Sequence, residues 1–151
     1  GRTRAQMYSG NVNYDIIDEA KKLNLLPIIA NGDISLNNFS NLDSKYDFEA
    51  YMIGREAIGN PLVFKNLCDL EEGKNINKTD LNDQIDLMKK HMFYLVEEYG
   101  ENRAISAFRG IAPFYIRGFN YAAMFRSNLV KMKSLSDFND IVKDLVRQNN
   151  D

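Results

Sequence analysis

The sequence predicts a mixed architecture, with a parallel α/β segment in the first half of the chain and an all-α segment in the second. Two short apolar runs, residues 26–30 and 48–53, are each followed by a turn and then by a helical pattern. That alternation is typical of parallel α/β folds. After residue 79 no further strand is predicted, and amphipathic helical patterns joined by short connections indicate a small helical bundle.

The composition of the 151 residues is that of a globular protein, since 44% are hydrophobic and 26% are charged. No apolar run reaches the roughly eighteen residues of a membrane span. One cysteine and one histidine exclude an internal disulfide framework and a His-rich metal site. We therefore expect a cytoplasmic protein without a bound metal. The sequence opens on Gly1 rather than on an initiator Met, which favours a piece of a longer protein.

In the first half, residues 14–23 have helical spacing and place four apolar side chains on one face. The run 26–30 shows no alternation, which predicts a strand buried on both faces, as in a parallel sheet. A turn over residues 31–33 ends it, and Ser35 is predicted to cap the next short helix. The apolar face of the first helix consists of Ile16, Ile17, Ala20 and Leu23.

The second strand, 48–53, ends at Gly54. Asn60 and Pro61 are typical of a helix start, because Asn can cap the first turn and Pro suits the first helical position. The stretch 71–79 is polar and lacks periodicity, so it is interpreted as a linker.

The second half is expected to contain four helices. Residues 80–99 have a long apolar stripe, and residues 101–117 form a helix that Pro113 is predicted to kink. A third helix is predicted over 121–132, and Ser136 is predicted to cap a fourth. The expected domains are residues 1–70, a linker over 71–79 and a helical domain over 80–151.

The charge is unevenly distributed. Residues 101–133 contain six lysines and arginines against one acidic residue, within a chain whose net charge is −2. Such a stretch is typical of a surface that binds a polyanion such as nucleic acid. A solvated helix face balanced by acidic neighbours would show the same pattern. The basic residues are Arg103, Arg109, Arg117, Arg126, Lys131 and Lys133.

Two strand ends indicate a phosphate site. In an α/β barrel, the loops after the last two strands often hold a phosphate. Gly32 and Gly54 would let the backbone approach the anion, and Arg55 would add a charged fork. Asn31 offers an amide, whereas the charge of Asp33 would repel a phosphate, so Asp33 is expected to fix the turn. The alternative interpretation is that both segments are ordinary turns without a ligand, since such turns would contain the same residues.

Three segments resemble the tRNA-dihydrouridine synthases, most closely their bacterial, DusB-like branch. The opening GRTRAQMYSG is similar to the family's GRTRxQxYxG pattern, and IANGDI at 29–34 is similar to its NGDI turn. MIGREAIGNP at 52–61 is similar to its MIGRxAxGNP segment. Residues 109–127 are similar to the family's helical tail, although Gly110-Ile111 stands where the family usually has Lys-His.

The resemblance implies the last two βα units of an (α/β)8 TIM barrel followed by a helical tRNA-binding domain. Members of the family are flavoprotein oxidoreductases of tRNA processing, in which hydride passes from NADPH or NADH to FMN and then to a uridine, giving dihydrouridine. By position, the resemblance assigns FMN binding to Asn31, Gly32, Asp33, Gly54 and Arg55. It assigns substrate contacts to Arg2, Arg103, Arg109, Arg117, Arg126 and Lys131.

The family's catalytic cysteine lies upstream of the GRTR segment, so we expect no catalytic residue in this chain. The full-length parent is expected to be a monomeric enzyme, and this piece alone to be inactive. Two alternatives stay open: a tRNA-binding helical module with inert barrel remnants, or another phosphate-binding barrel enzyme. Cys68 is expected to be a buried, inert thiol and His91 a partly buried structural residue.

Overall fold

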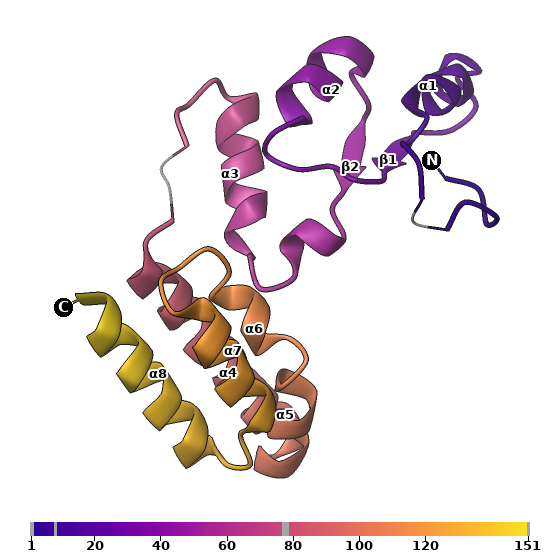
Figure 1. Cartoon of the computed structure of the whole chain (residues 1–151). Helices are drawn as coiled ribbons and strands as arrows, with labels where there is room; N and C mark the ends of the chain where they lie inside the picture. The colour runs from indigo at the N-terminus through magenta and orange to yellow at the C-terminus, as the bar shows by residue number, and fades with distance from the viewer. Residues whose placement is uncertain (1, 8, 77–78, 151) are drawn as a thin grey trace. The chain divides into compact units, whose positions relative to one another are not determined.

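The computed structural model describes residues 2–7, 9–76 and 79–150, which fold into two compact units (Figure 1). We call them the α/β unit, Gly1–Ala57 with Leu62–Ile76, and the helical unit, Ile58–Pro61 with Asn77–Asp151. Gly1 and Tyr8 of the GRTR segment, and residues 77–78 of the expected linker, lie outside the described residues.

The α/β unit contains a two-stranded parallel sheet and the helices that alternate with its strands. Ala30 pairs with Tyr51, and α2 connects the two strands, because parallel neighbours need a crossover rather than a tight turn. The predicted alternation of strands and helices is confirmed, although both strands are shorter than expected. In chain order the elements are α1 (Tyr14–Lys22), β1 (Ile29–Asn31), α2 (Phe39–Tyr46), β2 (Ala50–Met52), the 3-10 helix η1 (Arg55–Ala57) and α3 (Leu62–Glu71).

The two faces of this sheet differ in burial. On one face Ala30 is fully buried, and Tyr51 packs against a small hydrophobic cluster from the helices. On the other face Ile29 is 62% exposed and Met52 is 60% exposed. The prediction of a strand buried on both faces is therefore wrong, because no described element covers this second face. The buried members of the small cluster are Ile34, Phe39, Val63 and Leu67.

Two helices of the α/β unit also differ from their predictions. Helix α1 is capped by Asn13, whose Oδ1 accepts a hydrogen bond from the Ile16 N–H at 3.2 Å. None of its residues is buried, and on its predicted apolar face Ile16, Ala20 and Leu23 are exposed while Ile17 is half-buried. Helix α2 begins at Phe39 rather than after Ser35, because the Asn38 Oδ1 accepts from the Ser35 N–H at 2.9 Å and holds those residues in a turn.

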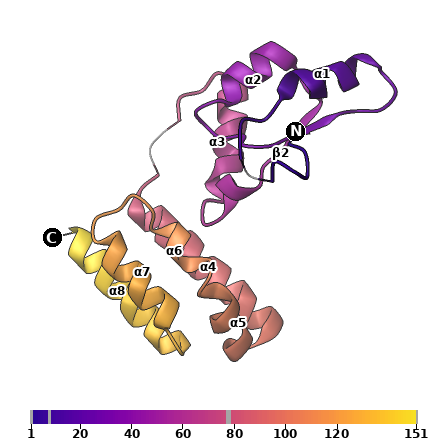
Figure 2. The ribbon, with the colours of Figure 1, turned by 45° about the vertical axis from the view of Figure 1, so that its right-hand side comes forward.

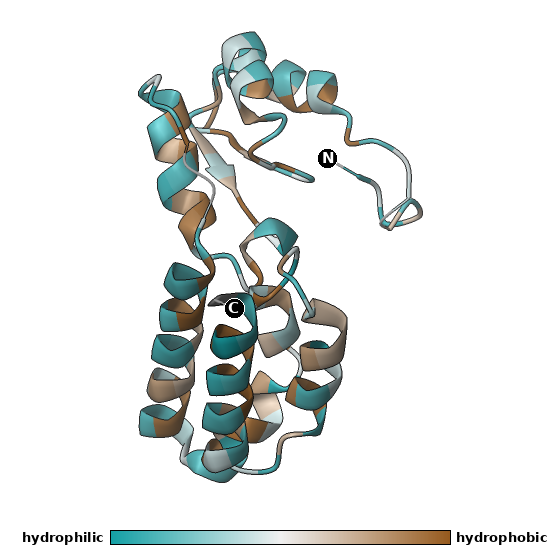
Figure 3. Ribbon diagram, turned by 60° about the vertical axis from the view of Figure 1, so that its left-hand side comes forward, coloured by the Kyte–Doolittle hydropathy of each residue, from teal (hydrophilic) through white to brown (hydrophobic). Residues whose placement is uncertain are grey.

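The helical unit is built around one hydrophobic cluster. Phe108, Phe125 and Phe138 come from three different helices, and none is more than 2% exposed. Hydrophilic residues occupy much of the outer surface of these helices (Figure 3). Helices α7 and α8 pack against each other, as two views show (Figures 1 and 2). The helices are α4 (Leu81–Tyr99), α5 (Glu101–Phe108), α6 (Ala112–Tyr115), α7 (Ala122–Lys131) and α8 (Leu135–Asn150).

Three predictions for the helices need correction. The single kinked helix predicted over 101–117 is in fact two helices. Helix α5 ends at Phe108, shortly before Gly110, and α6 begins at Ala112 with Pro113 in its first turn. Helix α8 begins at Leu135, so Ser136 lies inside its first turn and does not cap it. Cys68 on α3 is exposed rather than buried. His91 is partly buried, as predicted.

Candidate functional site

The two predicted turns follow adjacent strand ends. Because β1 and β2 are parallel and Asn31 pairs with Met52, residues 31–33 and 54–55 leave the same edge of the sheet. The Asn31 side chain joins these strand ends, since its Nδ2 donates to the Met52 carbonyl oxygen at 2.8 Å. This residue therefore has a structural contact in addition to the cofactor contact that the sequence suggested.

The carboxylate of Asp33 lies between two arginines. Its Oδ2 accepts a hydrogen bond from Arg2 Nη2, and its Oδ1 accepts one from Arg55 Nη2. The hydrogen bond from Arg2 is the main cause that lowers the pKa of the Asp33 carboxyl below its ordinary value. Two guanidinium groups and one ionised carboxylate leave a positive charge at this strand end.

Arg2 is the more enclosed of the two arginines. Its side chain is 12% exposed, whereas that of Arg55 is 59% exposed. Arg2 also donates to the Gly10 carbonyl oxygen, from Nε at 3.1 Å and from Nη2 at 2.8 Å. These contacts tie the opening segment to the turn after β1. From the sequence, Arg2 is predicted to contact the substrate; its contact with Asp33 leaves no signal in the local sequence pattern.

The two glycines of the turns have different surroundings. Gly32 has φ +129°, and a Cβ there would lie 2.8 Å from Val12 Cγ2, so this position favours glycine both in backbone conformation and in space. The Tyr14 hydroxyl donates to its carbonyl oxygen. At Gly54, by contrast, no atom of the described residues other than those of its chain neighbours lies within 4 Å of the place a Cβ would take. Open space beside a glycine and next to Arg55 is what an incoming anion requires.

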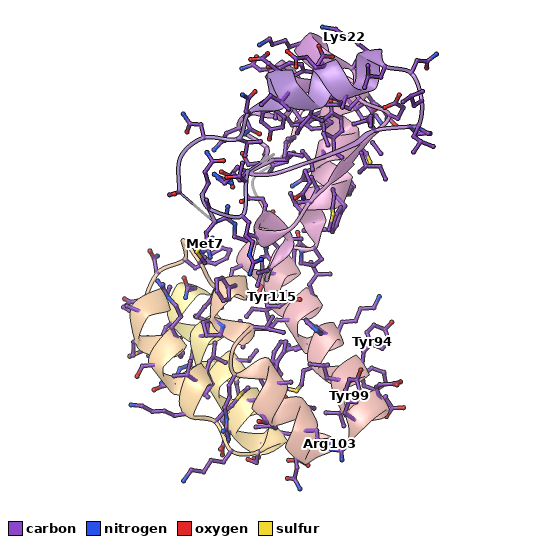
Figure 4. All side chains as sticks on the ribbon, turned by 90° about the vertical axis from the view of Figure 1, so that its right-hand side faces the viewer. Met7, Lys22, Tyr94, Tyr99, Arg103 and Tyr115 are labelled. Carbon is purple, nitrogen blue, oxygen red and sulfur yellow. The ribbon has the colours of Figure 1, made fainter. Side chains whose placement is uncertain are left out.

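The predicted basic residues are spread over several elements of the helical unit. Arg103 is exposed on α5 and points away from the body of the unit (Figure 4). The guanidinium carbon of Arg117 lies 5.1 Å from the centroid of the Phe114 ring, a cation–π contact. On α7, Arg126 Nε donates to the Ala122 carbonyl oxygen at 3.2 Å.

Arg109 connects two of these elements. It is half-buried, and its Nε donates to the Met132 carbonyl oxygen at 2.7 Å. Lys131 and Lys133 flank Met132 in the sequence and are both exposed. The structure thus brings three of the basic residues into one neighbourhood, where Arg109 has a structural contact and the two lysines face solvent.

Within the part of the chain that the structure describes, no helix is both long and apolar enough to cross a membrane. The same residues contain no group of three or more His, Cys, Asp or Glu side chains arranged to hold a metal ion.

Comparison with known proteins identifies the family. The model of the family "Dihydrouridine synthase (Dus)" matches residues 1–150. The chain is 32% identical over 137 residues to a probable tRNA-dihydrouridine synthase of Rickettsia prowazekii, covering 88% of this chain and 41% of that protein. It is 35% identical over 118 residues to tRNA-dihydrouridine synthase B of Shewanella oneidensis, covering 77% and 37%. The chain thus spans about two fifths of the length of these relatives. The family that the sequence motifs indicated is confirmed: the chain belongs to the dihydrouridine synthases.

Proposed function

We propose that this chain is the part of a tRNA-dihydrouridine synthase that binds the phosphate end of FMN and contacts the tRNA substrate. The observation that carries the proposal is the cluster at the strand ends, where Asp33 holds Arg55 beside the open space at Gly54. A phosphate fits this arrangement, because it would meet an exposed guanidinium and a backbone that no Cβ shields. The relatives named above are tRNA-dihydrouridine synthases, which supports tRNA as the partner.

We infer that β1 and β2 are the last two strands of an (α/β)8 barrel. The exposed apolar side chains of Ile29 and Met52 support this, because the uncovered sheet face would become the packed interior of a closed barrel. The greater length of the relatives also supports it, since the missing strands would come from the part of them that this chain does not span.

In this proposal, the residues of the chain bind and orient but do not transfer protons. FMN, when bound, would supply hydride transfer from NADPH or NADH to the uracil ring. Gly54 and Arg55 would hold its phosphate, and Asn31, Gly32 and Asp33 would keep the two turns in place. Arg2, which is half-buried and donates hydrogen bonds to Asp33 and to the Gly10 carbonyl oxygen, would position the turn rather than touch the substrate. We place the proton donor outside this chain.

Changing Arg55 to Ala in the full-length protein tests the phosphate site. We expect FMN affinity to fall by about 1.5–3 kcal/mol, because a charge-assisted hydrogen bond is lost. Flavin fluorescence titration measures this. Lys65→Ala is the matched control, since Lys65 is an exposed cation that pairs with Asp69 on α3. Equal FMN affinity in both variants would remove Arg55 from the site.

A second experiment tests the tRNA contacts. Replacing Arg103, Arg117 and Lys131 together by Ala should weaken tRNA binding and flatten its salt dependence by about one unit of slope per lost phosphate contact. The control replaces Lys65, Lys89 and Lys143, three exposed cations outside residues 101–133. If both triple variants lose the same affinity, the basic stretch is only a solvated surface. If tRNA binds but the full-length protein binds no flavin, a tRNA-binding module without catalysis is the better reading.

A further inference from the structure

The connection between α6 and α7, residues 116–121, ends on a tyrosine in an unfavourable backbone conformation. Tyr121 has φ +58° and lies in the left-handed region, where a bulky aromatic residue is an outlier. Asn24, Asp33 and Asp47 also have positive φ, but Asn and Asp tolerate this conformation. Tyr121 therefore costs the fold free energy that an asparagine at the same position would reduce.

The side chain of Tyr121 does not offset this cost in the part of the chain that the structure describes. The residue is 58% exposed, and its side chain makes no hydrogen bond that caps α7. Among the described residues its hydroxyl has no hydrogen-bond partner and its ring contacts no other ring. Strained residues of this kind cluster at functional sites. An exposed aromatic ring that the fold does not use is available to a ligand.

Two arginines flank Tyr121. Arg126 folds back toward the first turn of α7, because its Nε donates to the carbonyl oxygen of Ala122, the residue after Tyr121, at 3.2 Å. Arg117 begins the same connection, and its guanidinium carbon lies 5.1 Å from the centroid of the Phe114 ring. Neither arginine forms an ion pair with an acidic side chain among the described residues. Both charges are therefore available to an anion.

The surrounding sequence favours a polyanion as that ligand. Glu101 is the one acidic residue in the stretch 101–133, and its Oε1 accepts a hydrogen bond from the Leu135 N–H at 2.8 Å. Positive charge beside an exposed aromatic ring fits a nucleotide, since the cations contact phosphates while the base stacks on the ring. The bases of double-stranded RNA are stacked inside the helix, so this arrangement favours an unpaired nucleotide.

We propose that the connection between α6 and α7 is a stacking site for an unpaired nucleotide of RNA. The ring of Tyr121 stacks on the base, and Arg117 and Arg126 contact the phosphates on either side of it. The inference rests on the proposed function, which makes tRNA the partner, and it adds the kind of nucleotide that the helical unit recognises. All of the residues involved belong to the helical unit.

Binding of two RNAs to the 151-residue chain tests the site: a single-stranded oligouridylate of about twelve nucleotides and an RNA duplex of the same length. Tyr121→Asn should weaken single-strand binding about tenfold, the scale of one lost stacking contact, and leave duplex binding unchanged. Tyr121→Phe should bind like the wild type, because stacking needs the ring and not the hydroxyl. Tyr94→Asn is the control, since it removes an exposed tyrosine of α4 outside the basic stretch (Figure 4). It should change neither affinity.

The stability of the same variants separates a binding role from a structural one. Because Asn tolerates the left-handed conformation, Tyr121→Asn should unfold at the same urea concentration as the wild type or at a higher one. A clearly lower unfolding midpoint would show that the ring stabilises the fold, and would overturn the proposal.

Unchanged single-strand affinity in Tyr121→Asn, or an equal loss in Tyr94→Asn, would also overturn it, and the exposed ring would then be a candidate contact for a protein partner. Failure of the proposed function has a different signature. If the triple variant of Arg103, Arg117 and Lys131 binds tRNA as well as its control, the tRNA role itself has failed. If that triple variant is impaired and Tyr121→Asn is not, only the stacking site is wrong.

Discussion

At the scale of single residues, one carboxylate organises the candidate site. Asp33 accepts hydrogen bonds from Arg2 and Arg55, so it keeps two like charges close together at one strand end. Its own backbone has φ +49°, in the left-handed region that Asp tolerates better than most residues. The expectation that Asp33 fixes the turn agrees with these contacts. The Asp33 carboxylate would not attract a phosphate itself. It supports the proposed phosphate site by holding the two arginines in place.

Asp33→Asn should make the α/β unit less stable at neutral pH, with a dependence on pH. The pKa of the Asp33 carboxyl is lowered in the folded chain, chiefly by Arg2. Its contribution is therefore present above the unfolded pKa, near 3.9, and is lost as the pH falls through the lower folded pKa. The stability difference between the wild type and Asp33→Asn should be present at pH 6 and should shrink below about pH 4.

Unfolding followed by circular dichroism across this range measures the effect. Asp47→Asn is the control, since the Asp47 carboxylate is fully exposed and lies 3.8 Å from Lys21. A gap between Asp33→Asn and wild type that stays constant down to pH 3 would show that the carboxylate charge is not the cause.

At the scale of elements, the start of α8 shows what local sequence can predict. The Ser134 Oγ accepts a hydrogen bond from the Asp137 N–H at 3.1 Å, and the Asp137 Oδ2 accepts one from the Lys133 N–H at 2.7 Å. This arrangement is a variant of the capping box, in which the acidic residue is Asp and its carboxylate accepts from the residue before the N-cap Ser134. The signal was present in the sequence, because Ser134 has an acid three residues later whereas Ser136 has Asn139.

Ser134→Ala should destabilise the helical unit by about 1 kcal/mol, the usual cost of losing an N-cap side chain. Ser136→Ala is the matched control: it removes the same hydroxyl from an exposed position two residues further on, and should change the free energy of unfolding by less than about 0.5 kcal/mol. Urea denaturation of the two variants gives the comparison. An equal effect in both would mean that the hydrogen bond at Ser134 contributes nothing.

Other features of the elements were not predictable from local sequence. Alternating strand and helix patterns are local, so the parallel pair and the closeness of Asp33 to Arg55 could be inferred from the sequence. Burial depends on partners, so the exposure of Ile29 and of the apolar face of α1 could not. The contact between Arg2 and Asp33 joins residues 31 positions apart, and no local sequence pattern indicates that such distant residues lie together.

At the scale of the whole molecule, the two units have unequal cores. The buried cluster of the helical unit draws on all of its helices, from Leu81 on α4 to Leu145 on α8. The α/β unit depends on a cluster centred on Phe39 and Val63, beneath a sheet whose other face is bare. Because the hydrophobic effect scales with the apolar area removed from water, most of the stability should reside in the helical unit.

The isolated 151-residue chain should therefore show two levels of hydrogen-exchange protection. We expect strong protection in α4, α5, α7 and α8 and weak protection in β1 and β2. A two-stranded sheet has unpaired backbone groups on its outer edges. Because one of its apolar faces is exposed, little buried surface stabilises the pairing of the two strands. The turns that we propose hold the FMN phosphate depend on those strands, so the chain alone should not retain FMN and should not reduce uridine. Equal protection throughout, together with a stoichiometric yellow complex with FMN, would show that the small sheet is stable by itself and that the turns need no further strands to keep their geometry.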